Sequence, residues 1–251
     1  MSLFDLSGRW AIVTGANTGI GRAIAVGLAA AGADIVGVGR SAMTDTEAEV
    51  RAAGRQFRSV TVDLSRPGSA ATVISDALAA GATPDILVNN AGIIRRADSL
   101  DFTEEDWDAV LDTNLKSVFF LCQAFARAAI TAGRPAKIVN IASLLSFQGG
   151  IRVPSYAAAK SGLAGITRLL ANEWAARGIN VNAIAPGYVE TNNTTALRAD
   201  AERNADILKR IPAGRWARPE DMAGAAVFLA SPASDYVHGA ILPVDGGWLA
   251  R

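Results

Sequence analysis

The sequence predicts an α/β fold built on one doubly wound parallel sheet with helices on both faces. Short apolar, β-branched segments alternate with helical segments along most of the 251 residues, as expected when helices connect parallel strands. A glycine-rich turn joins the first strand to the first helix. Hydrophobic residues make up 50% of the chain, enough for a large core. Folds of this class and length commonly form one domain, so we expect a single domain over 1–251.

The first half of the chain alternates regularly between strands and helices. Trp10–Thr14 is short, apolar and β-branched, as a strand buried on both faces should be. Thr103 stands where a helix N-cap is expected, with Asp106 three residues further on. The same reasoning predicts strands at 10–14, 34–39, 57–62 and 85–89, and helices at 22–31, 44–53, 69–80 and 103–111.

The second half follows the same rule except in one segment. Apolar runs predict helices at 118–132, 156–177 and 221–229, and strands at 137–141, 180–184 and 240–244. The segment 186–218 departs from the rule, because a Pro-Gly pair, a polar run and many charged residues follow one another there. Long excursions after a strand are usually lids or binding loops. We therefore expect a substrate loop at about 186–218.

Charge and cysteine content exclude several classes of protein. The 24 basic and 24 acidic residues balance, so nothing indicates a nucleic-acid partner. The single cysteine, Cys122, lies in an apolar run and is expected to pack in the core, which suits a reducing cytoplasm. The longest apolar run, 23–33, ends at Asp34, and the N-terminus has no signal-peptide pattern, so we expect no membrane span. No metal site is expected.

The glycine-rich turn reads Gly15-x-x-x-Gly19-x-Gly21. A strand, a glycine loop and a helix in succession present backbone N–H groups and a helix N-terminus to a pyrophosphate. Glycine lets the backbone approach such a ligand without an intervening Cβ. The spacing is only a relative of the usual dinucleotide fingerprint. Taken alone, an ordinary turn between a strand and a helix explains it about as well.

Tyr156 and Lys160 stand four residues apart in a run of Ala and Ser that predicts the start of a helix. Their side chains therefore lie on one face, within reach of one ligand. A nearby ammonium favours the ionised form of a phenol and lowers its pKa. Ser143, at the end of a predicted strand, can offer a hydroxyl to the same ligand. An exposed helix with an incidental Tyr and Lys is the simpler alternative for the pair alone.

Five stretches together resemble the short-chain dehydrogenase/reductase family over the whole chain. They are Thr14-Gly15-x-x-x-Gly19-x-Gly21, Asn89-Asn90-Ala91-Gly92, Asn114, Ser143 with Tyr156-x-x-x-Lys160, and Pro186-Gly187-x-x-x-Thr191. The resemblance implies a Rossmann-type fold with NAD or NADP across the carboxyl ends of the strands. It implies four catalytic roles: Tyr156 as acid/base, Lys160 to lower the pKa of Tyr156 and hold the ribose, Ser143 to polarise the carbonyl, and Asn114 to support a water.

The resemblance also assigns the contacts of the cofactor. Asp63 matches an acid that accepts from the adenine amino group, although a strand-end cap explains it nearly as well. Without the resemblance, a helix cap would likewise be preferred for Asn114. Thr191 matches the residue that closes over the carboxamide. Besides Tyr156 and Lys160, the expected cofactor-binding residues are Gly15, Asn17, Thr18, Gly19, Ile20, Gly21, Arg40, Asp63, Leu64, Asn90, Ala91, Gly92, Pro186, Gly187, Val189 and Thr191.

The choice between NAD and NADP is divided in the sequence. The end of the second strand carries Gly39 where NAD enzymes usually have an acid, and Arg40 follows it. Thr18 occupies a position where many NADP-dependent relatives are basic. The acids at 45, 47 and 49 would counter a phosphate if they faced the cofactor. We expect NAD, with NADP as the alternative.

Longer stretches at 91–96, 146–156, 185–194, 210–216 and 244–251 are a further source of resemblance. They resemble one subgroup, the bacterial 2-keto-3-deoxygluconate dehydrogenases of uronate breakdown. The implied substrate is a small keto sugar acid, whose carboxylate suits an Arg fork and whose hydroxyls suit amides. The expected substrate-binding residues are Arg95, Arg96, Gln148, Arg152 and Asn192, with Arg198 or Arg251 in reserve. Each of these alone is more often a solvated surface residue.

Two rival functions are also compatible with these motifs. A 3-oxoacyl carrier-protein reductase has all five motifs, but it needs an apolar acyl groove. A non-catalytic nicotinamide-binding regulator usually loses the Tyr or the Lys, and this chain has both. The resemblance also implies a homotetramer, for which runs such as 118–121 supply apolar surface, although core burial would explain them equally.

Overall fold

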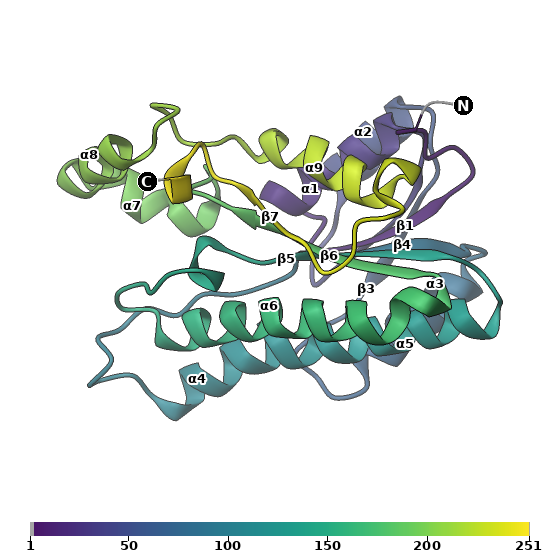
Figure 1. The fold of residues 1–251 in the computed structure, drawn as a ribbon, viewed down its shortest axis with the longest axis horizontal. Helices are drawn as coiled ribbons and strands as arrows, with labels where there is room; N and C mark the ends of the chain where they lie inside the picture. The colour runs from purple at the N-terminus through teal and green to yellow at the C-terminus, as the bar shows by residue number, and fades with distance from the viewer. Residues whose placement is uncertain (1–2, 251) are drawn as a thin grey trace.

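The computed structural model describes residues 3–250. Its centre is a seven-stranded parallel sheet in the order β3-β2-β1-β4-β5-β6-β7, which lies between two helical layers (Figure 1). The order reverses direction between β1 and β4, as a doubly wound sheet requires. The strands are β1 (Trp10–Thr14), β2 (Asp34–Gly39), β3 (Phe57–Thr61), β4 (Pro84–Asn89), β5 (Ala136–Ile141), β6 (Ile179–Pro186) and β7 (Ile241–Val244).

Two sets of helices cover the two faces of the sheet. The helices α1 (Gly19–Ala30), α2 (Thr44–Ala52) and α9 (Ala223–Ala230) lie on one face, and α3 (Ser69–Ala79), α5 (Ser117–Thr131) and α6 (Pro154–Trp174) on the other (Figure 1). Each set has its own apolar cluster, because a sheet of buried strands must cover both faces. Ile24 and Leu28 of α1 belong to one cluster, and Leu121 and Leu163 of α5 and α6 to the other. The predicted fold class is confirmed.

Most predicted boundaries agree with the structure to within one or two residues. Thr103 caps α4 (Glu104–Leu111), and its hydroxyl oxygen accepts from the backbone N–H of Asp106 at 3.2 Å. Two features differ from the prediction. A π-helical turn at Asp112–Lys116 joins α4 to α5 without a break. The segment after β6 contains two helices, α7 (Thr195–Ala199) and α8 (Ala201–Arg210).

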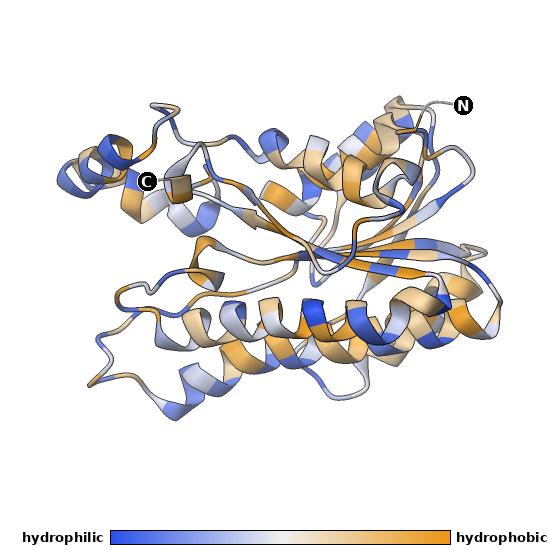
Figure 2. Cartoon of the chain, viewed as in Figure 1, coloured by the Kyte–Doolittle hydropathy of each residue, from blue (hydrophilic) through white to orange (hydrophobic). Residues whose placement is uncertain are grey.

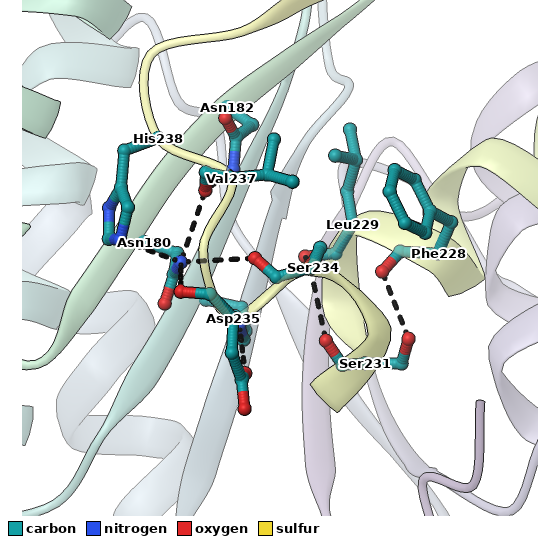
Figure 3. Close-up of polar contacts among 10 residues, drawn as sticks. Asn180, Asn182, Phe228, Leu229, Ser231, Ser234, Asp235, Val237 and His238 are labelled. Atoms are coloured by element: carbon teal, nitrogen blue, oxygen red, sulfur yellow. Dashed lines mark hydrogen bonds and ion pairs between the residues drawn. The ribbon is translucent and has the colours of Figure 1, made fainter. Parts of the chain in front are cut away.

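Two asparagines of β6 attach the last loop to the sheet (Figure 3). The side-chain amide of Asn182 donates to the carbonyl of Val237 at 2.8 Å and accepts from the N–H of Ala240 at 2.9 Å. Asn180 Nδ2 lies within 3.2 Å of three loop carbonyl oxygens, at residues 234, 235 and 237, and of the ring of His238. These contacts fix the approach to β7.

Apolar residues concentrate on the central strands and their flanking helices, whereas α8 is mainly hydrophilic (Figure 2). A third, smaller apolar cluster holds this helix in place. Its buried members are Leu144, Ile207, Ile211, Trp216 and Trp248. Within residues 3–250, no helix combines the length and apolar character needed to cross a membrane.

Candidate functional site

A cleft of about 1380 Å³ opens where the strands end. It is lined by the turn after β1, the segments that follow β4, β5 and β6, and parts of α6 and α8. Ligands of doubly wound sheets bind outside the carboxyl ends of the strands, where the strand order reverses. The cleft therefore lies where the fold places a binding site.

The glycine turn forms one end of the cleft. Gly15 and Gly19 have φ of +66° and +53°, which favour glycine. A Cβ on Gly21 would overlap the carbonyl oxygen of Gly15 and the amide of Asn90. Thr14 ties the turn to the end of β4, because its hydroxyl oxygen accepts from the N–H of Asn90 at 2.9 Å and of Ala91 at 3.0 Å. The shape of this end is set by backbone contacts.

Tyr156 and Lys160 lie on one turn of α6, near its start. Pro154 opens the helix, a position where its missing N–H costs nothing. Lys160 Nζ lies 5.6 Å from the centre of the Tyr156 ring and donates to the carbonyl oxygen of Ile141 at 2.6 Å. Both side chains line the cleft, as does Ser143 at the end of β5. The predicted trio therefore meets in one place.

Burial dominates the ionisation of this pair. It raises the pKa of Tyr156, while hydrogen bonding to Ser143 and the charge of Arg96 act in the opposite direction. Burial also lowers the pKa of Lys160 from 10.5 to about 8. Near pH 7 the site thus presents a protonated phenol next to an ammonium group.

Asn114 lies behind the cleft, in the π-helical turn. Its side chain is fully buried, accepts from the N–H of Ile93 at 2.8 Å and donates to the carbonyl oxygen of Ile93 at 2.8 Å. Both functions of the amide are therefore occupied by the chain that follows β4. This amide fixes the position of that chain and does not line the cleft.

The predicted cofactor residues fall into two groups. Most line the cleft: Gly15, Asn17, Thr18, Gly19, Ile20, Arg40, Asn90, Ala91, Gly92, Pro186, Gly187, Val189 and Thr191. Gly21, Asp63 and Leu64 do not. The Asp63 carboxylate accepts from the hydroxyl of Ser65 at 2.8 Å and from its N–H at 3.0 Å, which lowers the pKa of Asp63. That geometry matches the local cap considered as an alternative.

The predicted substrate residues are also divided. Arg96, Gln148, Arg152 and Asn192 line the cleft, whereas Arg95 pairs with Asp106 at 3.0 Å outside it. Arg96 donates to the carbonyl oxygen of Asn193 at 3.0 Å. Arg152 lies 3.3 Å from a carboxylate oxygen of Asp98, and its φ of +61° is unusual for a residue other than glycine. Arg251 lies outside the described residues.

The sequence reasoning missed the contribution of α8. Arg203 and Arg210 of this helix both line the cleft. Their spacing of seven residues is two helical turns, which places them on one face, and it could have indicated a shared surface. Trp248 also lines the cleft, although the sequence could not separate core, interface and sugar-stacking roles for it.

Comparisons with known proteins match this chain to dehydrogenases and reductases. A family model described as enoyl-(acyl carrier protein) reductase matches residues 15–249. The 2-dehydro-3-deoxy-D-gluconate 5-dehydrogenase of Escherichia coli is 58% identical over 251 residues, which cover 100% of this chain and 99% of that protein.

Two solved structures are similar over nearly their whole length. One, from Agrobacterium tumefaciens, is provisionally assigned as a 2-deoxy-D-gluconate 3-dehydrogenase with bound NADP; it is 63% identical, with a TM-score of 0.94 and 100% of both chains covered. The other is a gluconate 5-dehydrogenase from Burkholderia cenocepacia in complex with NADP and tartrate; it is 40% identical, with a TM-score of 0.93, and covers 99% of this chain and 98% of that one.

Proposed function

The chain belongs to the short-chain dehydrogenase/reductase family and is an NAD(P)-dependent enzyme; we propose that it interconverts the C5 hydroxyl and keto groups of a 2-keto-3-deoxy sugar acid. The meeting of Ser143, Tyr156 and Lys160 in a cleft that several arginines also line carries this proposal. A carbonyl beside the phenol and a carboxylate beside a guanidinium are the two groups that such a cleft fits.

In the reductive direction, we propose that Tyr156 donates the proton. The substrate carbonyl accepts hydrogen bonds from the hydroxyls of Ser143 and Tyr156, and the phenol proton moves to the oxygen as negative charge develops there. The nicotinamide, when bound, supplies the hydride to the carbonyl carbon. The ammonium of Lys160 stabilises the tyrosinate that remains, because an opposite charge nearby favours the ionised form. Oxidation reverses each step.

The residues of the cleft fit a dinucleotide. Gly15 and Gly19 of the turn line the cleft without a Cβ, so their backbone stays accessible to a pyrophosphate at one end. Thr191 faces this turn, and its Cγ2 would lie 3.4 Å from a Cβ on Gly19. We propose that the glycine turn, Asn90 and Thr191 hold the cofactor, with Lys160 on the nicotinamide ribose.

We propose NADP as the better cofactor, which revises the expectation of NAD. That expectation depended on Thr18, on the subgroup that the chain resembles and on acids near Arg40. Of these acids, Asp45 and Glu49 both pair with Arg22. Arg40 lines the cleft and has no ion pair among residues 3–250. A guanidinium in that position suits a 2′-phosphate. Both solved relatives described above contain NADP, which supports the same choice.

The ratio of kcat/KM for NADPH and NADH tests the cofactor proposal. Arg40→Gln should lower this ratio at least roughly tenfold, the scale of one charge-assisted hydrogen bond. Arg177→Gln, at an exposed position in the turn that precedes β6, is the control and should leave the ratio unchanged. A wild-type preference for NADH would contradict the proposal.

A panel of carbonyl substrates tests the reaction itself. The panel contains the C5-keto form of a 2-keto-3-deoxy hexonate, a neutral keto sugar and a 3-oxoacyl thioester, each with NADPH. We expect the highest kcat/KM with the sugar acid, because the arginines that line the cleft can pair with its carboxylate, a group that the thioester and the neutral sugar lack. The highest value with the thioester would instead identify a reductase of acyl carriers.

We propose further that the chain works as one catalytic domain, in a homotetramer and in the cytoplasm. The single sheet of β1 to β7 supports one domain. The lone cysteine is buried, and its pKa is raised to about 12, so it is neither a reactive thiol nor a disulfide partner. Exposed apolar residues on α4, α5 and α6 support assembly.

A further inference from the structure

We propose that Arg210, stacked on Trp248, binds the carboxylate of the substrate. This inference rests on the proposed function and assigns its acid-recognition site to α8, away from the arginines that the sequence suggested. Among the cleft arginines of residues 3–250, Arg210 is the one whose guanidinium is held by an aromatic ring instead of by an acid or a carbonyl oxygen.

Trp248 forms the platform of the proposed site. The guanidinium carbon of Arg210 lies 3.9 Å from the centre of the indole, so the planar group is held close to the ring. The indole N–H also has a partner, because the side-chain oxygen of Gln148 accepts a hydrogen bond from Trp248 Nε1 at 3.3 Å. With its oxygen used in this way, the amide of Gln148 has its NH₂ group left to donate. Trp248 thus positions two groups that can donate hydrogen bonds, the guanidinium of Arg210 and the NH₂ group of Gln148.

The platform itself is rigid. Trp248 is buried, and Tyr188 packs against it with ring centres 4.7 Å apart. Tyr188 also contacts Trp216 edge-on, with ring centres 5.3 Å apart. An arginine that stacks on a fixed ring has already lost much of its side-chain freedom, so less entropy is lost when it binds an anion.

The position of the platform connects it to the reacting carbonyl. Leu144 belongs to the same apolar cluster as Trp248 and directly follows Ser143 in the chain. Arg210, Gln148, Trp248 and Ser143 all line the same cleft. A sugar acid with its carbonyl at Ser143 therefore extends along the cleft toward α8.

Three of the other cleft arginines already have partners. Arg22 pairs with Asp45 and Glu49, and Arg152 pairs with Asp98. Arg96 donates to the carbonyl oxygen of Asn193. In the described part of the chain, no carboxylate lies within ion-pair distance of Arg210.

Two further arginines of the cleft lack an acidic partner, and neither has the same support. Arg40 lies at the end of β2, near the glycine turn. Arg203 lines the cleft without a ring contact. Arg210 is therefore the cleft cation that is both oriented and uncompensated.

Steady-state kinetics of the purified enzyme at saturating NADPH test the inference. The probes are the C5-keto form of a 2-keto-3-deoxy hexonate and its methyl ester, which lacks the charge. Arg210→Gln should raise the KM of the acid at least roughly tenfold, because a charge-assisted bond is lost. It should leave the dissociation constant of NADPH unchanged and bring the kcat/KM of acid and ester together. Arg210→Lys keeps a charge but not the planar stack and should be intermediate.

The controls separate this inference from the proposed function. Trp248→Ala removes the platform and should raise the KM of the acid as Arg210→Gln does, whereas Arg177→Gln should leave the KM of both substrates unchanged. Unchanged KM in Arg210→Gln, or a larger increase in Arg152→Gln, overturns the inference and leaves the proposed function intact. If wild-type enzyme uses the ester as well as the acid, no residue recognises the charge, and the inference is wrong. Wild-type enzyme that turns over neither probe contradicts both.

Discussion

Single residues of the site owe their ionisation to burial. Lys160 is 5% exposed and makes one hydrogen bond, to a neutral carbonyl oxygen, so its charge is poorly solvated and its pKa falls to about 8. The same burial keeps the phenol of Tyr156 protonated, since it raises the pKa of that group. A proton donor and a cation of moderate acidity thus stand next to each other at neutral pH.

Replacing Tyr156 with Phe keeps the ring and removes the proton donor. Turnover should fall by at least roughly a hundredfold, the usual contribution of general acid catalysis. The dissociation constant of NADPH should stay within about twofold, because Lys160 and the glycine turn are untouched; fluorescence titration measures it. Near-normal turnover in this variant would show that another group supplies the proton.

The rate of reduction should depend on pH through Lys160. A lysine with a lowered pKa loses its charge as the pH rises through about 8, so kcat/KM should fall there, well before a phenol with a raised pKa titrates. In Lys160→Arg the cation persists to high pH, and the remaining activity should lack this decline. A wild-type profile that stays flat to pH 10 would contradict the assignment.

The same shift affects stability with a definite sign. Between about pH 8 and 10.5 the unfolded chain binds more protons at Lys160 than the folded one. The contribution of this residue to the free energy of unfolding therefore increases with pH across that window, because the cost of burying the charge disappears.

At the level of elements, the glycine turn between β1 and α1 depends on contacts that leave no space. Gly21→Ala would push a methyl group against the Gly15 carbonyl and the Asn90 amide. Overpacking of this kind costs about 1–3 kcal/mol, and the displaced turn should raise the dissociation constant of NADPH at least roughly tenfold. Gly224→Ala is the matched control, since an added Cβ there meets no atom within 4 Å. Equal affinity in the two variants would contradict a role for this turn in binding.

The elements were predictable from the sequence to different degrees. Short β-branched runs predict buried strands such as β2, and the capping residue Thr103 predicts the start of α4. The π-helical turn at Asp112–Lys116 has no such local signal, because its extra residue depends on the contacts of Asn114 with Ile93. Helix α8 was not predicted because most of its residues are polar. Its short apolar side packs on residues far away in the chain.

The site shows the same division. Motif spacing correctly predicted that Tyr156, Lys160 and Ser143 lie together. Residues four apart on a helix share one face, and Ser143 follows a strand that ends at the same edge of the sheet. It did not separate Arg95 from Arg96, which are neighbours in sequence but have different partners in space. Arg210 was missed because its partner, Trp248, comes from the end of the chain.

At the scale of the whole molecule, α4, α5 and α6 each expose a large apolar side chain. Trp107 on α4, Phe120 on α5 and Leu169 on α6 are 40%, 47% and 48% exposed, on helices that lie on the same side of the sheet (Figure 1). Apolar patches of this kind mark protein interfaces, and closed symmetric assemblies are the usual result.

We therefore predict a homotetramer, with a mass four times the 26.0 kDa of the chain in multi-angle light scattering. Phe120→Asp and Leu169→Asp should each lower that mass, because a charge in an apolar interface is costly. Leu78→Asp, at an equally exposed position on α3, should leave the mass unchanged. A wild-type monomer at micromolar concentration would contradict the assembly and leave the chemistry untouched.

The small apolar cluster around Trp216 and Trp248 affects which residues of such a protein can be substituted during evolution. Because α8 is held by this cluster and not by the two large cores, its residues can vary without loosening the sheet that carries Tyr156 and Lys160. New preferences for acids, sugars or neutral ketones can then arise by exchange of a few side chains on one short helix. Substrate preference and the catalytic step thus depend on different elements of the fold.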